Sequence, residues 1–120
     1  WKFSALKDER TRYGGGFREN SKDKIVVKID SDLKELIPGY LQNRRNGIAN
    51  IRAALETKDF ELIQRQGHSM KGSGAGYGFV PVSTLGASIE EAGKTENVKE
   101  TLDAIDQLAQ YLDRIVVVYD

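Results

Sequence analysis

The spacing of apolar residues from residue 31 onward is the feature that most constrains how this chain can fold. Apolar residues and glycines recur there every three or four positions, which is the period of an α-helix and not the alternation of a strand. Four segments show this period: 31–58 (Ile37, Leu41, Ile48, Ile51, Leu55), 59–77 (Ile63, Gly67, Met70, Gly74, Tyr77), 81–93 (Val82, Leu85, Ile89, Ala92) and 97–115 (Leu102, Ile105, Leu108, Ala109, Leu112, Ile115). Four amphipathic helices with short joints predict an all-α fold, an antiparallel four-helix bundle.

Capping signals mark the ends of the predicted helices. Asp32 and Glu35 form a capping-box pattern, and Pro38 fits a first helical turn, where its missing N–H costs nothing. We therefore expect helical structure to start here, with a short N-terminal lead-in helix before the bundle. The other predicted ends are an N-cap at Asp59, a start at Pro81, a stop at Gly93 and a capping box formed by Asn97 and Glu100.

Two β-branched stretches interrupt the helical pattern, Ile25-Val26-Val27 before the bundle and Val116-Val117-Val118 after it. One interpretation is a small β-ribbon that pairs residues 25–29 with residues 116–119. The other is that the three valines extend or fray the last helix, because short apolar runs suit either structure.

The N-terminal part of the chain differs in kind from the rest. Residues 1–24 hold 7 Lys/Arg against 4 Asp/Glu, a net charge of +3, which leaves −3 for residues 25–120. Charge and a glycine triplet at 14–16 predict a linker or N-terminal arm over 1–24, followed by a bundle domain over 25–120. The alternative is an ordered extension packed by Trp1, Phe3, Leu6, Tyr13 and Phe17. Since the sequence opens on Trp1, we expect a piece of a longer protein.

The composition excludes several kinds of chemistry. The 120 residues include no cysteine and one histidine, so thiol nucleophiles, disulfides and multi-histidine metal sites are excluded. The formal net charge is zero with that histidine neutral, which argues against nucleic-acid binding. No apolar run approaches the roughly 20 residues that cross a bilayer, so we expect a cytoplasmic protein without membrane contact.

The single histidine, His68, falls on the outward face of the second predicted helix. With Ile63 at zero and about 100° per residue, His68 lies at about 140° from the core direction. Lys71 and Gly72 are one turn away and are its neighbours on that face. A lone histidine is usually an ordinary surface or core residue, and these neighbours favour a functional one.

Five glycines fall between residues 67 and 78, although each costs about 0.5–1 kcal/mol in a helix relative to Ala. Gly67 and Gly74 point inward, where close helix packing explains them. Gly72 points outward beside His68, where it would let the backbone of a partner approach. A phosphate-cradling nucleotide loop at 72–78 is the rival interpretation, but the segment follows a helix and fits neither the Walker pattern nor G-x-G-x-x-G.

Other polar residues on these helices have ordinary structural explanations. We expect Ser73 to pack on the helix face or to hydrogen-bond to the carbonyl four residues earlier. We expect Arg44, Arg45 and Arg65 to be solvated or ion-paired and not to be docking contacts.

The segment His68-Ser69-Met70-Lys71-Gly72-Ser73, followed by Gly78-Phe79 and Ile89-Glu90, resembles the H-x-x-K-G-S…G…L-E signature of histidine-containing phosphotransfer (HPt) domains in bacterial phosphorelays. The turn at 55–60 and the segment 36–41 are similar to the same family, the latter to HPt domains fused to response regulators or sensor kinases. The resemblance extends from about residue 31 to residue 115.

This resemblance implies that His68 accepts a phosphoryl group from the aspartyl phosphate of a receiver domain and passes it to another receiver. Lys71 would offset the phosphate charge, and Gly72 would give the receiver access. The family often has Gln at the position of Glu90, whose carboxylate would orient the imidazole but repel the phosphate. No cofactor is expected in this chain, and Mg²⁺ is expected on the receiver.

The implied partners are receiver domains of response regulators and a fused or separate sensor histidine kinase. The module would act as a monomer and as a phosphocarrier, because the sequence has no ATP-binding or kinase motif. The alternative function is an adaptor bundle that docks a receiver or kinase without being phosphorylated.

Overall fold

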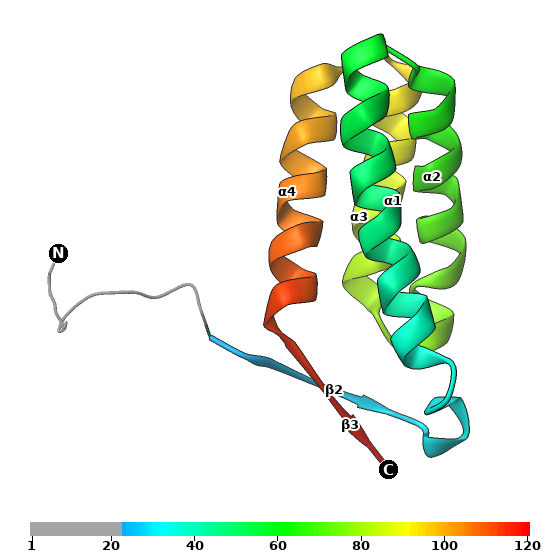
Figure 1. The fold of residues 1–120 in the computed structure, drawn as a ribbon, viewed down its shortest axis with the longest axis vertical. Coiled ribbons are helices and arrows are strands. Elements are labelled where there is room, and N and C mark those ends of the chain that lie inside the picture. Colours follow the sequence, from blue (N-terminus) through cyan, green and yellow to red (C-terminus); the bar gives the residue numbers. More distant parts are fainter. Residues whose placement is uncertain (1–22) are drawn as a thin grey trace, which may run out of the picture.

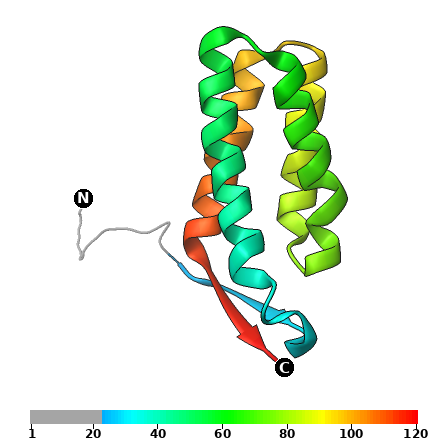
Figure 2. The same ribbon diagram turned by 45° about the vertical axis from the view of Figure 1, so that its right-hand side comes forward.

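The computed structural model describes residues 23–120, and nearly all of the predicted arm lies outside these residues. The described chain forms four helices that alternate in direction, as predicted for an antiparallel bundle (Figure 1). Their bounds are α1 Ile37–Thr57, α2 Phe60–Ser73, α3 Val80–Lys94 and α4 Val98–Arg114. The bundle pairs α2 closely with α3, as the turned view in Figure 2 shows.

The core lies along the predicted apolar stripes. The side chains of Ile63, Met70, Ile89 and Leu108 are fully buried between the helices. Leu102 was predicted to be a core residue but is 38% exposed, and the buried position in that turn is Thr101. The Thr101 hydroxyl donates to the Asn97 carbonyl at 2.9 Å, which satisfies this polar group inside the helix. None of the described helices is long and apolar enough to cross a membrane.

Two of the predicted N-caps are confirmed. The Asp59 carboxylate accepts from the Leu62 N–H at 3.2 Å, and the Asn97 side chain accepts from the Glu100 N–H at 3.0 Å. Both caps satisfy backbone donors that a helix start leaves without partners.

The predicted capping box at Asp32 is wrong. The lead-in helix is a single 3₁₀ turn, η1 (Ser31–Leu33), and its cap is Asp30, whose carboxylate accepts from the Asp32 N–H at 2.9 Å. The α-helix starts later, at Ile37, with Pro38 in its first turn as predicted. The expected capping box between Asp32 and Glu35 is therefore replaced by a bond from the Asp30 side chain to the backbone N–H two residues later. This bond belongs to the short turn η1, which ends before α1 begins.

Two predicted helix ends are also wrong. Gly93 does not stop α3, which continues to Lys94 and is followed by Glu96 in a left-handed conformation with φ 54°. Instead Gly93 is buried against α2, where an added Cβ would lie 2.7 Å from the Gln64 backbone nitrogen. Ile115 was assigned to the last helix but is the first residue of a strand.

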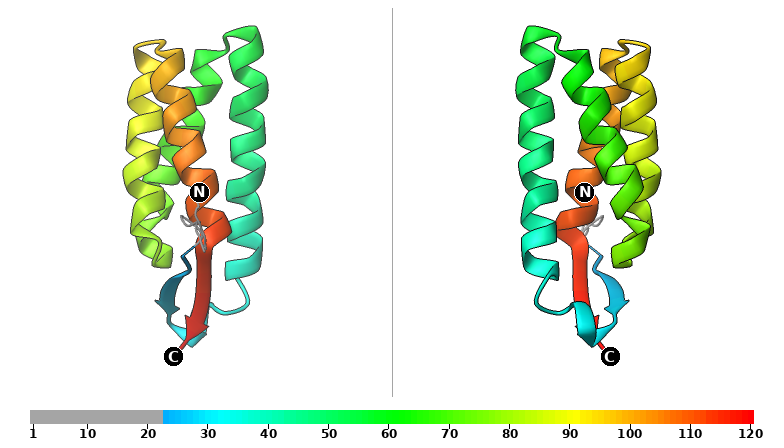
Figure 3. Two further views of the ribbon diagram at one scale, coloured as in Figure 1. Left: turned by 90° about the vertical axis from the view of Figure 1, so that its left-hand side faces the viewer. Right: turned by 90° about the vertical axis from the view of Figure 1, so that its right-hand side faces the viewer.

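The two β-branched stretches pair as a ribbon. Strand β2 (Ile25–Ile29) runs parallel to β3 (Ile115–Tyr119), with Ile25 opposite Ile115. The strands lie at the end of the bundle where α1 begins and α4 ends (Figure 3). Alternate residues of both strands pack against the core, and the intervening residues Val26, Val116 and Val118 are exposed. Such alternation is typical of a strand that packs one face against a core and exposes the other. The three valines therefore belong to a strand and do not extend α4.

Candidate functional site

The position of the site depends on a close contact between the backbones of α2 and α3. A Cβ added at Gly67 would collide with the backbone nitrogen of Glu90 and lie 2.8 Å from both its Cα and the Gly86 carbonyl oxygen. A Cβ at Gly86 would lie 2.8 Å from Met70 Cβ and 2.9 Å from the Gly67 carbonyl oxygen. The predicted packing role of Gly67 is confirmed, and this contact brings Glu90 of α3 next to the outward face of α2.

Gly86 is a residue that the sequence analysis missed. Its spacing of seven residues from Gly93 places both glycines on one face of α3, which was the available signal. Gly74 closes the same contact at the end of α2, because an added Cβ there would lie 2.8 Å from the Phe79 carbonyl oxygen.

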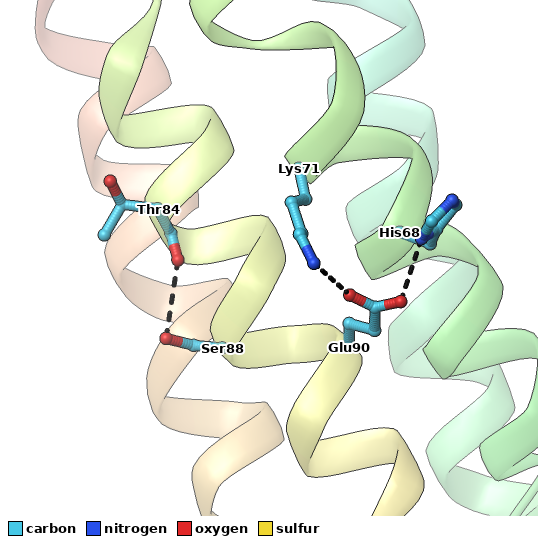
Figure 4. Close-up of polar contacts among 5 residues, drawn as sticks. All are labelled: His68, Lys71, Thr84, Ser88 and Glu90. Carbon is cyan, nitrogen blue, oxygen red and sulfur yellow. Dashed lines mark hydrogen bonds and ion pairs between the residues drawn. The ribbon is translucent and has the colours of Figure 1, made fainter.

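Glu90 joins the two charged or titratable residues predicted on α2 (Figure 4). Its Oε2 lies 2.9 Å from His68 Nδ1, and its Oε1 lies 3.2 Å from Lys71 Nζ. The His68 side chain is 73% exposed and that of Lys71 is 53% exposed, whereas that of Glu90 is only 12% exposed. The Glu90 carboxylate is therefore largely buried and contacts two exposed side chains, one through each of its oxygens.

The contacts of Glu90 with His68 and Lys71 determine which nitrogen of the His68 imidazole carries no proton. Hydrogen bonds from His68 and then from Lys71 lower the pKa of the Glu90 carboxyl below its ordinary value of 4.5, although desolvation opposes this shift. Glu90 is therefore ionised at neutral pH and can only accept hydrogen bonds. The neutral imidazole must carry its proton on Nδ1, which leaves the lone pair on Nε2, and an exposed imidazole with a free lone pair is a competent nucleophile.

Gly72 lies on the exposed part of α2, one turn after His68. Apart from its two chain neighbours and the backbone of its own helix, no heavy atom lies within 4 Å of the position that its Cβ would occupy. The open space predicted beside His68 is present, and the packing of the bundle does not account for this glycine.

The segment 72–78 has no geometry of a nucleotide loop. It contains the end of α2, the 3₁₀ turn η2 (Ala75–Tyr77) and Gly78, whose φ is 98°. A helix precedes it, whereas phosphate-cradling loops follow a buried strand. Within residues 23–120, no three His, Cys, Asp or Glu side chains are grouped to hold a metal ion.

The expectations for the neighbouring polar residues hold with one exception. The Ser73 hydroxyl donates to the Ser69 carbonyl at 3.0 Å, Arg45 pairs with Asp113 at 2.9 Å, and Arg65 pairs with Glu61 at 3.6 Å. Arg44 was expected to be solvated or ion-paired, but it is half-buried and donates to the Ser73 hydroxyl at 3.1 Å.

Comparison with known proteins identifies one family. The family model described as "Hpt domain" matches residues 35–117, which is most of the chain and includes all four residues of the site. No curated protein and no solved structure matched the chain.

Proposed function

The chain belongs to the Hpt domain family, and from this membership we propose that His68 carries a phosphoryl group between the aspartates of receiver domains. Hpt domains are phosphocarrier modules and not kinases, and they generally interact with receivers. The observation that supports His68 as the acceptor is its 73% exposed ring, whose Nδ1 lies 2.9 Å from the Glu90 carboxylate. The same contact leaves Nε2 directed away from the carboxylate and available for attack.

The transfer requires few groups from this chain. The lone pair of Nε2 forms the N–P bond while the P–O bond to the donor aspartate breaks, and the aspartate leaves as a carboxylate. Positive charge develops on the imidazole as the bond forms, and the proton on Nδ1 remains in the hydrogen bond with Glu90. Phosphoryl transfer depends mainly on alignment and on charge neutralisation, so the receiver with its Mg²⁺ supplies the remaining groups.

Lys71 has a second role after transfer. Its ammonium lies 3.2 Å from Glu90 in the described state, and its side chain is half exposed on a flexible stem. A phosphoryl group on His68 brings two negative charges one helical turn away, and we expect Lys71 to turn from Glu90 toward them.

The proposed module comprises residues 25–120, acts as a monomer in the cytoplasm and receives its phosphate from a receiver or through a sensor histidine kinase. Mixing the chain with Mg²⁺ and a receiver domain phosphorylated by acetyl phosphate tests this function. We expect a label on the chain that is labile in acid and stable in alkali. Binding to the receiver without transfer in either direction would instead support the adaptor function.

Replacing Glu90 by Gln tests how the imidazole is oriented. A Gln side chain can donate to Nδ1 as well as accept from it, so it no longer fixes the tautomer or compensates the charge that develops on the ring. We expect labelling of Glu90→Gln by phosphoramidate to be roughly tenfold slower, equivalent to about 1.4 kcal/mol in the barrier. We also expect the phosphohistidine to last longer, because ring protonation assists its hydrolysis. Both rates are measured by phosphorus NMR.

The matched control is Glu91→Gln, which removes the same charge from the next residue of α3. Glu91 is exposed, and no side-chain contact links it to His68 within the described residues. Equal labelling rates for the Glu90 and Glu91 variants would exclude the orienting role of Glu90.

Replacing Gly72 by Ala separates stability from access. Ala at this helical position should raise the free energy of unfolding by about 0.5–1 kcal/mol, because it meets no neighbour and lowers the entropy of the unfolded chain. Transfer from a receiver should nevertheless fall about tenfold, whereas labelling by the small donor phosphoramidate should not change. Urea unfolding and the two labelling rates measure these effects.

Gly39→Ala is the control for this variant, because Gly39 is also an exposed helical glycine whose added Cβ would meet no atom of another element within 4 Å. It should change stability alone. Unchanged receiver transfer in Gly72→Ala would show that the receiver does not use the open space.

A further inference from the structure

Arg44 of α1 differs from the neighbouring arginines in how its charge is balanced. Arg45, Arg52 and Arg65 each lie within 4.0 Å of a carboxylate. The guanidinium of Arg44 has no carboxylate partner in the described part of the chain, and its buried Nε has no hydrogen-bond acceptor there. A half-buried cation without a counter-ion is costly to keep, so an anionic ligand would stabilise it.

Neutral groups hold this cation in place. The guanidinium carbon lies 4.9 Å from the centroid of the Tyr40 ring, and Nη1 donates to the Ser73 hydroxyl. Tyr40 is itself fixed, because its ring stacks on Tyr77 at 4.3 Å and its hydroxyl lies 3.0 Å from the Ser73 hydroxyl. Arg44 is therefore ordered before any ligand arrives, which lowers the entropy cost of binding.

The cation lines a polar groove between α1 and α2. The groove has a volume of about 400 Å³, and most of its lining side chains carry amide, hydroxyl or guanidinium groups that can donate hydrogen bonds. Asn43, Asn46 and Asn50 contribute from α1, and Arg65, Gln66 and Ser69 contribute from α2. Hydrogen-bond donors around a free cation are suited to carboxylate side chains.

The groove continues to the phosphate acceptor. Arg65 and Ser69 also line a second concavity, of about 490 Å³, that contains His68 and Glu90. His68 thus has a carboxylate on its α3 side and cationic donors on its α1 side. A partner that presents negative groups around its own phosphate is repelled by the carboxylate on the α3 side and attracted by the cationic groups on the α1 side.

We propose that Arg44 and the groove beside it receive an acidic segment of the receiver domain that exchanges phosphate with His68. This proposal rests on the proposed function, and it adds the surface that orients the partner. Electrostatic complementarity of this kind acts mainly on the rate and specificity of association. Arg44 is then a docking residue that does not touch the transferred phosphoryl group.

The test compares Arg44→Gln with Arg52→Gln. Arg52 is an exposed arginine of the same helix, but it pairs with Asp106 of α4 and so faces away from the groove. The probe is the receiver domain, among those of the source organism charged with acetyl phosphate, that labels the wild-type chain fastest. We expect its second-order rate constant to fall about tenfold in Arg44→Gln with a weaker dependence on salt, and to stay within twofold in Arg52→Gln.

Two further measurements keep the outcomes distinct. Phosphoramidate should label His68 equally in both variants, and thermal unfolding should show that Arg44→Gln is folded despite the loss of its contact with Tyr40. Arg44→Lys keeps the charge and should recover part of the rate. Equal receiver rates in the Arg44 and Arg52 variants would overturn the docking proposal alone, whereas failure of every donor to label wild-type His68 would overturn the proposed function.

Discussion

We expect His68→Gln to abolish phosphorylation of the chain, both by phosphoramidate and by a phosphorylated receiver. His68 is the only histidine in the sequence and its ring is 73% exposed, so no other imidazole can accept the phosphoryl group. The expected loss is at least a thousandfold, equivalent to about 4 kcal/mol in the barrier. Acid-labile label is counted after electrophoresis in alkali, and label that persists in this variant would exclude His68 as the acceptor.

The same variant should leave the bundle folded. The side chain of His68 contacts only Glu90 by hydrogen bonding in the described structure, and Glu90 retains its contact with Lys71. Exposed substitutions of this kind usually change stability by less than about 0.5 kcal/mol. A thermal unfolding curve that overlays that of the wild type will show that lost labelling reflects lost chemistry.

Gly67→Ala is expected to have the largest effect on stability. Its new methyl group meets the backbone of Glu90 and the Gly86 carbonyl, and neither can move without separating α2 from α3. We expect a loss of about 1–3 kcal/mol or more in the free energy of unfolding, measured in urea. Separation of the helices also withdraws Glu90 from His68, so the variant that folds should be labelled as slowly as Glu90→Gln.

Gly72→Ala provides the contrast, because the same change five residues later on α2 meets open space and should stabilise the protein. If Gly67→Ala does not fold at room temperature, the same variant at low temperature or Gly86→Ala can report on the same contact. Equal stability of the Gly67 and Gly72 variants would contradict the close packing of α2 and α3.

Most of the bundle could be predicted because its determinants are local. The apolar period predicts all four helices, and the side chains of Asp59 and Asn97 cap α2 and α4 as expected. Gly93 was assigned the wrong role, because a glycine that ends a helix and a glycine that a neighbouring helix touches look alike in sequence. The pairing of 25–29 with 116–119 was one of two interpretations that the sequence left open, and the structure confirms it. Its parallel direction and its register were not predicted, since the two strands are about 90 positions apart in the chain.

The site likewise contains residues that local sequence spacing predicts and residues that depend on contacts between helices. The spacing of His68, Lys71 and Gly72 places them on one face of α2 without knowledge of any other helix. The proximity of Glu90 was available only through the family resemblance, because the glycine contact that produces it crosses two helices. Arg44 was expected to be solvated or ion-paired, and its contact with Ser73 was not predicted because Ser73 lies on another helix, 29 residues away in sequence.

The parallel ribbon also decides how the bundle responds to mechanical force. The chain enters at the Ile25 end of the ribbon and leaves at its Tyr119 end, and further bonds join Arg114 to the Asp23 carbonyl and Asp120 N–H to the Ile29 carbonyl. Tension between residues 23 and 120 therefore pulls the two strands along each other and loads their hydrogen bonds together, not one after another. The ribbon acts as a shear clamp that shields the four helices, and with them the contact between His68 and Glu90, from forces transmitted along the chain.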